Sequence, residues 1–299
     1  MMKTKPIIVG LGEILWDLLP DGKVLGGAPA NVACHAGRLG GESYVVSAVG
    51  KDKPGREILH KLKRMGLKSE YISVDVAHPT GIVTVKLDKI GVPDFTIHTG
   101  VAWDYIPWND NLHELAKKAD AICFGSLAQR LETSRKTIRN FLLQSKKECL
   151  RIFDVNLRQS FFNKEILKES LKISDFFKLN DDELPVISKM FSANGSEHDI
   201  SLKILDEFNL KLIAVTKGSK GSSLYTRDEV SSYKVPEVNV VDTVGAGDAF
   251  TAVLIMGLLR GLPLKKIHEN ATEIAAFVCT QKGATPKLPV NYITKFMNF

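Results

Sequence analysis

The sequence has few cysteines and none of the spacings that cysteine chemistry needs. Its 299 residues include four cysteines, and no Cys-x-x-Cys pair is present. Widely spaced cysteines with apolar neighbours are typical of reduced, buried thiols, so we expect neither a disulfide framework nor a thiolate metal site. The cysteines are Cys34, Cys123, Cys149 and Cys279.

Long apolar runs are also missing. No stretch reaches the length of a membrane span, and the first twenty residues contain Glu13 and Asp17, which a secretory signal would lack. We therefore expect a cytoplasmic protein that does not bind a membrane. The chain has no internal repeat and no linker of biased composition, so a single domain over residues 1–299 is predicted.

The basic residues do not form a nucleic-acid surface. The formal net charge is +6, but Lys and Arg occur as scattered pairs and no basic stripe with aromatic residues is present. Such pairs beside helical patterns are typical of solvated helix faces. We therefore expect no nucleic-acid partner, and a nucleotide-sized anion is the alternative that this charge would favour.

Short apolar runs alternate with segments of helical period, which predicts a mostly parallel sheet with helices on both faces. The predicted strands are residues 6–11, 44–49, 121–124, 152–155, 176–179 and 212–216. The predicted helices are residues 29–39, 55–65, 134–145, 164–171, 181–190 and 200–208.

Two segments break this rhythm. Polar and apolar residues alternate over 80–87 and 94–98, on either side of Gly91-Val92-Pro93, and the β-like stretch 15–24 has a turn at Pro20-Asp21-Gly22. They predict a small antiparallel sheet, formed by about 13–25 and 72–104, that closes as a lid over a substrate or is a plain edge hairpin. An apolar face on this lid would suit a homodimer.

Residues 242–248 read Asp-Thr-Val-Gly-Ala-Gly-Asp and lead into an apolar, helix-like run. The backbone N–H groups of Gly245, Ala246 and Gly247 at a helix start would bind an anion. Asp248 adds a carboxylate beside them, and phosphoryl transfer to a hydroxyl needs both groups. The simpler alternative is a tight turn followed by a capped helix.

A second cluster lies near the N-terminus. Gly26 and Gly27 allow a ligand to approach the backbone closely, and Asn31 follows on the first turn of the predicted helix. Asp17 adds a carboxylate that can accept two hydroxyl hydrogen bonds. These four residues predict a polyol cradle, although a glycine turn before a helix would look the same.

Two further clusters follow strands. Asn180 and Glu183 are three residues apart, so at a helix start they share a face and could hold a hydrated magnesium ion with its phosphate oxygens. Helix capping is the alternative, and we assign it to Asp181 and Asp182.

The loop with Thr216, Gly218 and Gly221 could wrap phosphate, although it is not a Walker A sequence. The dinucleotide fingerprint is also missing after the first strand, which argues against a Rossmann dehydrogenase.

The order of these clusters resembles the ribokinase-like carbohydrate kinases, from Gly12 to about Pro286. Within that family the sequence is most similar to fructokinases. The segments that carry this similarity are Gly12-Glu13-Ile14-Leu15-Trp16-Asp17, Gly26-Gly27-Ala28-Pro29-Ala30-Asn31, Ala102-Trp103-Asp104, Gly125-Ser126-Leu127-Ala128 and Asp154-Val155-Asn156-Leu157-Arg158.

The resemblance implies an ATP-dependent kinase that phosphorylates a small sugar. Asp248 would be the catalytic base, and the N–H groups of Gly245, Ala246 and Gly247 would form the anion hole. The sugar contacts would come from Asp17, Gly26, Gly27 and Asn31. Arg158 would be a second contact to the sugar hydroxyls or to the transferred phosphoryl group, or would form a surface salt bridge. Asn180, Thr216, Gly218 and Gly221 would bind the nucleotide, and Glu183 would bind Mg²⁺ through water.

The same resemblance implies an optional monovalent cation, K⁺, near Asp242, Val244 and Gly283. Lys287 departs from the family there, because a small hydroxyl residue is often found at its position. Fructose is the expected substrate. The alternatives within the family are 2-keto-3-deoxygluconate, ribose and a nucleoside, and the alternative outside it is a catalytically silent sugar-binding regulator.

Overall fold

A computed structural model describes residues 5–19, 22–87 and 93–297. Nine strands of these residues form one sheet, which is parallel except at β11–β12 and β12–β13. In sheet order they are β13 (Val230–Tyr233), β12 (Ser222–Tyr225), β11 (Leu212–Thr216), β10 (Phe176–Asn180), β9 (Leu150–Asp154), β8 (Ala121–Phe124), β1 (Ile7–Leu11), β4 (Glu42–Gly50) and β5 (Ile72–Asp75). The predicted mostly parallel sheet is confirmed.

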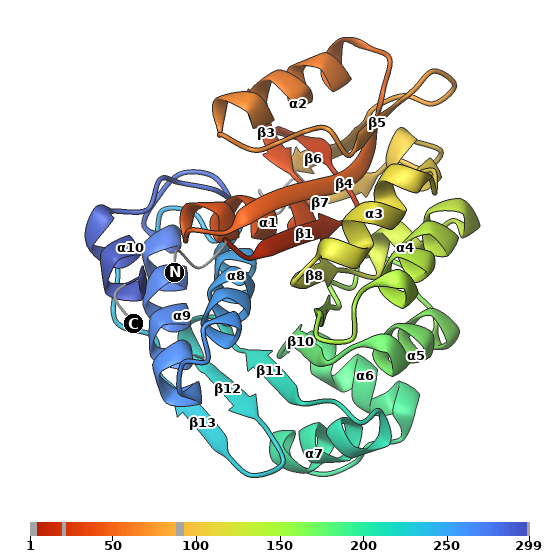
Figure 1. Cartoon of the computed structure of the whole chain (residues 1–299). Helices are drawn as coiled ribbons and strands as arrows, with labels where there is room; N and C mark the ends of the chain where they lie inside the picture. Colours follow the sequence, from red (N-terminus) through yellow and green to blue (C-terminus); the bar gives the residue numbers. More distant parts are fainter. Residues whose placement is uncertain (1–4, 20–21, 88–92, 298–299) are drawn as a thin grey trace.

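Helices cover both faces of this sheet (Figure 1). One face carries α1 (Ala28–Arg38), α8 (Ala246–Leu259), α9 (Leu264–Cys279) and α10 (Val290–Met297). The other carries α3 (Asp110–Lys118), α4 (Glu132–Gln144), α5 (Lys164–Ile173), α6 (Glu183–Phe191) and α7 (Glu197–Glu207). Neighbouring strand residues alternate between the two cores: Phe176 packs with α8 and Phe177 with the opposite helices.

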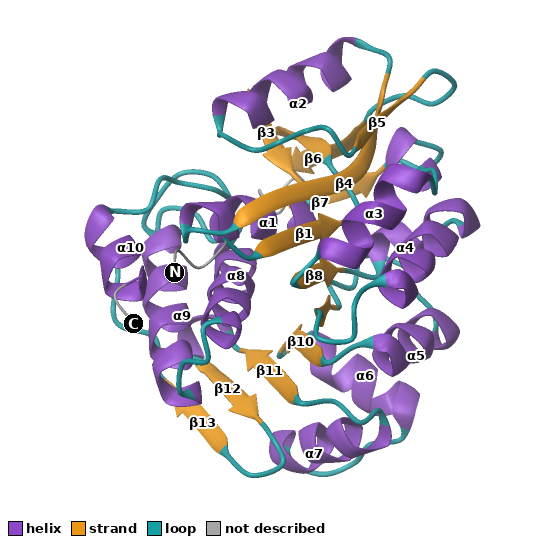
Figure 2. Cartoon of the chain, viewed as in Figure 1, coloured by secondary structure: helices purple, strands orange, loops and turns teal. Residues whose placement is uncertain are grey.

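A second, four-stranded sheet stands apart from the main one (Figure 2). Its strands, in order, are β3 (Gly22–Gly26), β2 (Leu15–Leu19), β6 (Gly81–Leu87) and β7 (Pro93–Ile97). The sheet is mixed rather than purely antiparallel, because β2 and β6 pair in parallel. The two predicted turns, at Pro20-Asp21 and Gly91-Val92, lie outside the described residues.

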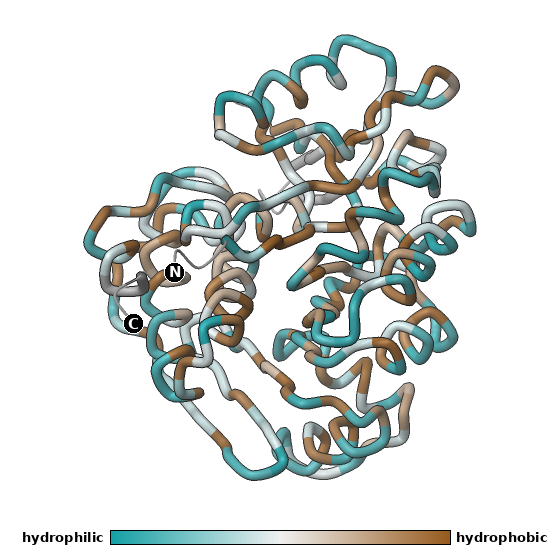
Figure 3. The backbone as a smooth tube through the Cα atoms, viewed as in Figure 1, coloured by the Kyte–Doolittle hydropathy of each residue, from teal (hydrophilic) through white to brown (hydrophobic). Residues whose placement is uncertain are grey.

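The helix α2 (Lys53–Arg64) packs between this small sheet and β4. It is hydrophilic over most of its length, whereas β1 is hydrophobic (Figure 3). The contrast follows from burial: α2 buries only one stripe, which consists of Gly55, Ile58 and Leu62, whereas β1 is covered on both faces.

Three short 3₁₀ helices complete the described chain, at Ala102–Tyr105, Leu127–Gln129 and Gly218–Lys220. The elements that the sequence patterns did not predict are β5, β12, β13, α3, α9 and α10. They lie mainly at the edges of the sheet or at the C-terminal end of the chain.

The topology brings the polar motifs to one edge of the main sheet. Strands β1, β8, β9, β10 and β11 run parallel, so their carboxyl ends meet there. The chain leaves β1 for β4 on one side, while β8 pairs on the other side. Ligands of open α/β sheets bind outside the carboxyl ends of the strands at such a switch point.

Candidate active site

A cleft of about 1780 Å³ opens at this edge, between the main sheet and the small sheet. The four motif clusters meet in it although they are far apart in the sequence. The predicted residues that line the cleft are Asp17, Gly26, Gly27, Asn31, Arg158, Asn180, Glu183, Thr216, Gly218, Gly221, Asp242, Val244, Gly245, Ala246, Gly247 and Asp248. Gly283 is the predicted residue that does not line it.

The glycine turn is the N-terminus of α8. Gly245 caps the helix with φ 81°, a left-handed conformation, and the first intrahelical hydrogen bond runs from the Ala249 N–H to the Gly245 carbonyl. A Cβ at Gly245 would clash with the carbonyl oxygen of Ala284, so glycine is required there. The N–H groups of the first turn have no intrahelical acceptor. That of Ala246 donates a long, 3.3 Å hydrogen bond to the Thr243 carbonyl, and those of Gly245 and Gly247 have no acceptor among the described residues, so an anion could bind there.

Asp248 lies in this first turn and is half-buried. The Asn31 side chain donates a 2.8 Å hydrogen bond to its Oδ2, which joins α1 to α8. Burial, followed by the nearby charge of Asp154, raises the pKa of Asp248 to about 6, although Lys178, Asn31 and Arg158 oppose the rise. The helix start alone would favour ionisation, but burial outweighs it.

The cradle residues lie on β2, on β3 and at the start of α1. Gly27 is the N-cap of α1 with φ 115°, and a Cβ there would clash with the backbone carbonyl of Glu13. Asp17 projects from β2 against Gly26, and burial raises the pKa of Asp17 to about 6. The charge of Arg158 lowers this pKa, so Arg158 lies near Asp17 in the cleft.

Arg158 follows β9 on a loop with two left-handed residues, Asn156 (φ 47°) and Gln159 (φ 48°). Its side chain is exposed and forms no ion pair with the described residues. Its charge also lowers the pKa of Glu13 and of Asp248. Arg158 therefore lines the cleft and forms no salt bridge with the described residues, and its contact with a ligand stays a prediction.

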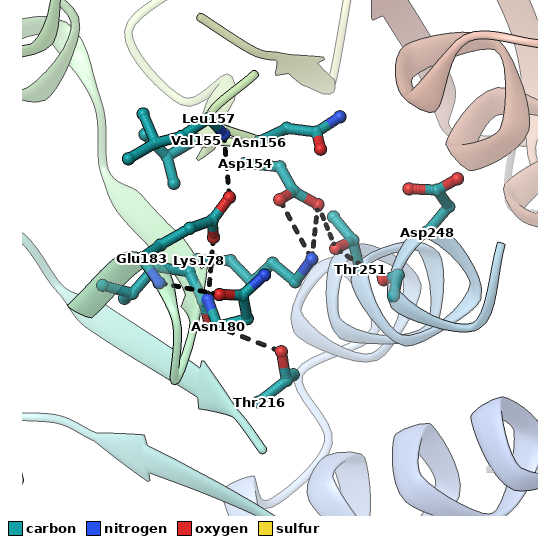
Figure 4. Close-up of polar contacts among 12 residues, drawn as sticks. Asp154, Val155, Asn156, Leu157, Lys178, Asn180, Glu183, Thr216, Asp248 and Thr251 are labelled. Atoms are coloured by element: carbon teal, nitrogen blue, oxygen red, sulfur yellow. Dashed lines mark hydrogen bonds and ion pairs between the residues drawn. The ribbon is translucent and has the colours of Figure 1, made fainter. Parts of the chain in front are cut away.

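The Asn180-x-x-Glu183 segment caps its own helix. Asn180 Oδ1 accepts the Glu183 N–H at 2.8 Å, and Glu183 Oε2 accepts the Asn180 N–H at 2.8 Å (Figure 4). The other carboxylate oxygen, Oε1, accepts the Leu157 N–H at 2.8 Å, which ties the Arg158 loop to the start of α6. The predicted capping by Asp181 and Asp182 is wrong: Asp181 pairs with Lys220 at 3.3 Å, and the side chain of Asp182 makes no capping hydrogen bond.

The proposed cation segments are in contact. Asp242 Oδ1 accepts the Val244 N–H and Asp242 Oδ2 accepts the Gly283 N–H, each at 3.0 Å. Over residues 5–19, 22–87 and 93–297, no group of three or more His, Cys, Asp or Glu side chains could hold a metal ion.

Several residues of the cleft were given no role by the sequence motifs. Glu13 is buried after β1, and burial raises its pKa to about 7. Lys178 lies within β10, and Asp154 is the last residue of β9. Both strands were predicted only as short apolar runs. The lid adds an apolar wall, which consists of Leu15, Val24, Val83 and Ile97. A charged residue inside an apolar strand is the one signal that could have revealed Lys178.

Within the described part of the chain, no helix is long and apolar enough to span a membrane.

Comparison with known proteins identifies the family. The model of the pfkB family carbohydrate kinases matches residues 21–291, so this chain belongs to that family. A putative sugar kinase from Pyrococcus horikoshii is 33% identical over 302 residues, covering 94% of this chain and 93% of that protein. A fructokinase from Klebsiella pneumoniae is also 33% identical over 302 residues, covering 93% and 95%.

Solved structures of sugar kinases are also similar to this chain. The Pyrococcus horikoshii sugar kinase in complex with ATP has a TM-score of 0.77 at 30% identity, with 94% of this chain and 95% of that chain covered. The fructokinase from Vibrio cholerae in its fructose, ADP and calcium ion bound form has a TM-score of 0.82 at 25% identity, with 98% and 99% covered. The chain is therefore an ATP-dependent sugar kinase, and its ribokinase-like fold is confirmed.

The cradle can be tested at Asp17. We expect Asp17→Ala to raise the sugar KM by ~10- to 100-fold with a smaller change in kcat, because a hydrogen bond to a charged group is worth ~1.5–3 kcal/mol. Steady-state kinetics at saturating ATP would measure this. Leu18→Ala is the matched control, since its side chain is the next one on β2 and is exposed. An unchanged KM in Asp17→Ala would remove Asp17 from the cradle.

Proposed function

We propose that this enzyme is a fructokinase, which transfers the γ-phosphoryl group of ATP to a primary hydroxyl of fructose, O6. The observation that carries the proposal is the 2.8 Å hydrogen bond from Asn31 to Asp248, because it joins a residue of the proposed cradle to the proposed base at the glycine turn. The similarity to the fructokinases of Klebsiella pneumoniae and Vibrio cholerae supports the same substrate.

In this mechanism Asp17, Gly26, Gly27 and Asn31 orient the sugar. Asp248 accepts the proton of the attacking hydroxyl as its oxygen bonds to the γ-phosphorus. The N–H groups of the glycine turn meet the charge on the transferring phosphoryl group. The transition state of phosphoryl transfer is loose, so positioning and electrostatics supply most of the rate.

Magnesium, when bound with the nucleotide, neutralises charge on the phosphate oxygens. The donor set fits an ion held mainly by phosphates and water, because Glu183 lines the cleft and each of its carboxylate oxygens already accepts a backbone N–H. Glu183 is the carboxylate that would face it, through water, with Asn180, Thr216, Gly218 and Gly221 along the nucleotide. Asp242, Val244 and Gly283 would serve K⁺.

A second substrate class has one observation in its favour. Arg158 is an exposed cation at the sugar end of the cleft and has no ion-pair partner among the described residues. Such a cation suits the carboxylate of an acidic sugar, 2-keto-3-deoxygluconate.

A substrate panel with coupled ADP detection tests the choice. We expect the highest kcat/KM with fructose, compared with ribose, 2-keto-3-deoxygluconate and a nucleoside. A preference for the acidic sugar that disappears in Arg158→Gln would replace fructose as the substrate.

The pH dependence follows from Asp248. Its pKa is raised to about 6, so the carboxylate needed as base is protonated below that pH. We expect kcat/KM to fall roughly tenfold per pH unit on the acid side of about pH 6 and to level off above about pH 7. Asp17, with a pKa of about 6, steepens the same limb. A profile that stays flat well below pH 6 would contradict the base role.

A homodimer through the lid sheet stays a prediction. Size-exclusion chromatography with light scattering would measure the mass in solution, and a monomer would contradict it.

A further inference from the structure

Lys178 is a cation on a buried strand. It lies on β10 between Phe177 and Leu179, whose side chains enter the core on the α3–α7 face. Alternation along the strand turns Lys178 to the opposite face, toward the start of α8. Its side chain is 12% exposed, and a lysine that is nearly buried needs a specific reason to be charged there.

Asp154 holds the ammonium group in place. Lys178 Nζ lies 3.0 Å from Oδ1 and 3.1 Å from Oδ2 of Asp154, which ends the neighbouring strand β9 (Figure 4). Burial alone would lower the pKa of Lys178, but the carboxylates of Asp154, Asp248 and Glu183 outweigh it and raise the pKa above its usual value. The ammonium group therefore stays charged.

Thr251 connects this ion pair to α8. Its hydroxyl lies 2.8 Å from Asp154 Oδ2 and 3.0 Å from the carbonyl oxygen of Gly247. Both carboxylate oxygens of Asp154 are thus occupied by Lys178 and Thr251. The arrangement fixes the lysine relative to the first turn of the helix.

The ammonium group lies against the anion-binding turn. A Cβ built at Gly247 would be 3.0 Å from Lys178 Nζ. The positive charge therefore stands beside the N–H groups that the site offers to a phosphoryl group, on the cleft side of the sheet, because Lys178 lines the cleft.

The charge balance of the cleft indicates why a cation is needed there. Among the described residues, two cations line it, Arg158 and Lys178. Arg158 lies on an exposed loop and lowers the pKa of Glu13, Asp17 and Asp248, whereas Asp154 fixes Lys178 beside the glycine turn. The carboxylates that line the cleft are Glu13, Asp17, Asp154, Glu183, Glu237, Asp242 and Asp248. A triphosphate entering this acidic cleft needs a fixed positive charge at its reactive end.

We propose that Lys178 is a catalytic residue that contacts the transferring phosphoryl group, and that Asp154 and Thr251 are its positioning residues. The sugar oxygen forms a bond to the γ-phosphorus while the bond to the bridging oxygen breaks and leaves its electron pair on ADP. The hydroxyl proton goes to Asp248. Lys178 keeps its proton and offsets the charge on the equatorial oxygens.

This inference rests on phosphoryl transfer from ATP and does not depend on which sugar is the acceptor. It is therefore tested with whichever sugar the wild-type enzyme accepts in the substrate panel. Failure of fructose as a substrate would leave it standing.

The first test is Lys178→Met. We expect kcat to fall by ~10²- to 10³-fold with the sugar KM little changed, as for loss of a transition-state donor. We also expect the affinity for ATP to fall more than the affinity for ADP, measured by calorimetry, because the contact is with the phosphoryl group that ADP lacks. Wild-type kcat, or an equal loss of ATP and ADP affinity, would overturn the proposal.

The Lys178→Met variant leaves Asp154 as an unpaired buried charge and can unfold for that reason. The double variant Lys178→Met with Asp154→Asn removes both charges and keeps the assay interpretable. If the lysine only neutralised Asp154, the double variant would recover kcat. We expect its melting temperature to recover and its kcat to remain low.

The opposite end of the same two strands offers a matched control. Arg151 on β9 pairs with Asp175 beside β10 at 3.4 Å and is 18% exposed, so it resembles Lys178 in burial, although Asp175 also pairs with Lys211 at 2.9 Å. Arg151→Met should lower the melting temperature and leave kcat and the ATP-to-ADP affinity ratio unchanged. For the positioning residue Asp154, Asp154→Asn should lower kcat less than Lys178→Met does; an unchanged kcat would remove that role.

Discussion

Asp248→Asn should lower kcat by ~10²- to 10⁴-fold, the usual contribution of a general base. The amide is the same size and can still accept the hydrogen bond from Asn31, so the cradle should bind sugar with wild-type affinity. The melting temperature should not fall, because burial raises the pKa of Asp248 and the charged form therefore opposes folding at neutral pH. Kinetics, sugar calorimetry and thermal unfolding measure these three quantities.

Asp110→Asn is the control for this substitution. Asp110 is also an acidic residue in the first turn of a helix, α3, but it is exposed and lies outside the cleft. It should leave kcat unchanged. Near wild-type turnover in Asp248→Asn would refute the base role and, with it, the proposed mechanism.

Gly245→Ala should lower kcat/KM by ~10²-fold, the loss expected when reacting groups are displaced by about 1 Å. Two causes act together. A non-glycine residue at φ 81° costs ~1–2 kcal/mol, and the added Cβ would clash with the backbone of Ala284. The clash is with backbone rather than a flexible side chain, so the glycine turn must shift, and the anion-binding N–H groups shift with it.

Gly261→Ala separates these two causes. Gly261 follows the other end of α8 with φ 68°, but nothing lies within 4 Å of an added Cβ. It should lose stability through backbone strain and keep its kcat/KM. If both variants lose activity equally, displacement of the turn is not the cause of the loss in Gly245→Ala.

The predicted strands and helices were found at their expected places because their signals are local. The apolar run 212–216 is β11 without a change in bounds, and the helical period of 164–171 continues only two residues further in α5. Elements without a strong period, such as β12 and β13, were missed. Each is only four residues long and contains two serines, so neither an apolar run nor a clear alternation marks it, although each pairs with its neighbour in the chain.

In the lid, local sequence patterns predict the hairpins but not how the hairpins pair with each other. Alternation predicted the hairpins β2–β3 and β6–β7 correctly, since each closes within a few residues. The parallel pairing of β2 with β6 joins segments separated by more than sixty residues, and no local pattern specifies such a partner. An antiparallel sheet was the natural prediction from hairpins alone.

The sequence by itself determined the family and the residues of the four clusters, because glycine turns, caps and strand ends are written in adjacent residues. Only the tertiary structure decided that these clusters share one cleft, that Asn31 touches Asp248, and that a lysine within an apolar strand faces the glycine turn. The physical reason is that charge and burial act through space. The pKa of Asp248 and the charge on Lys178 depend on groups that are neighbours only after the sheet has formed.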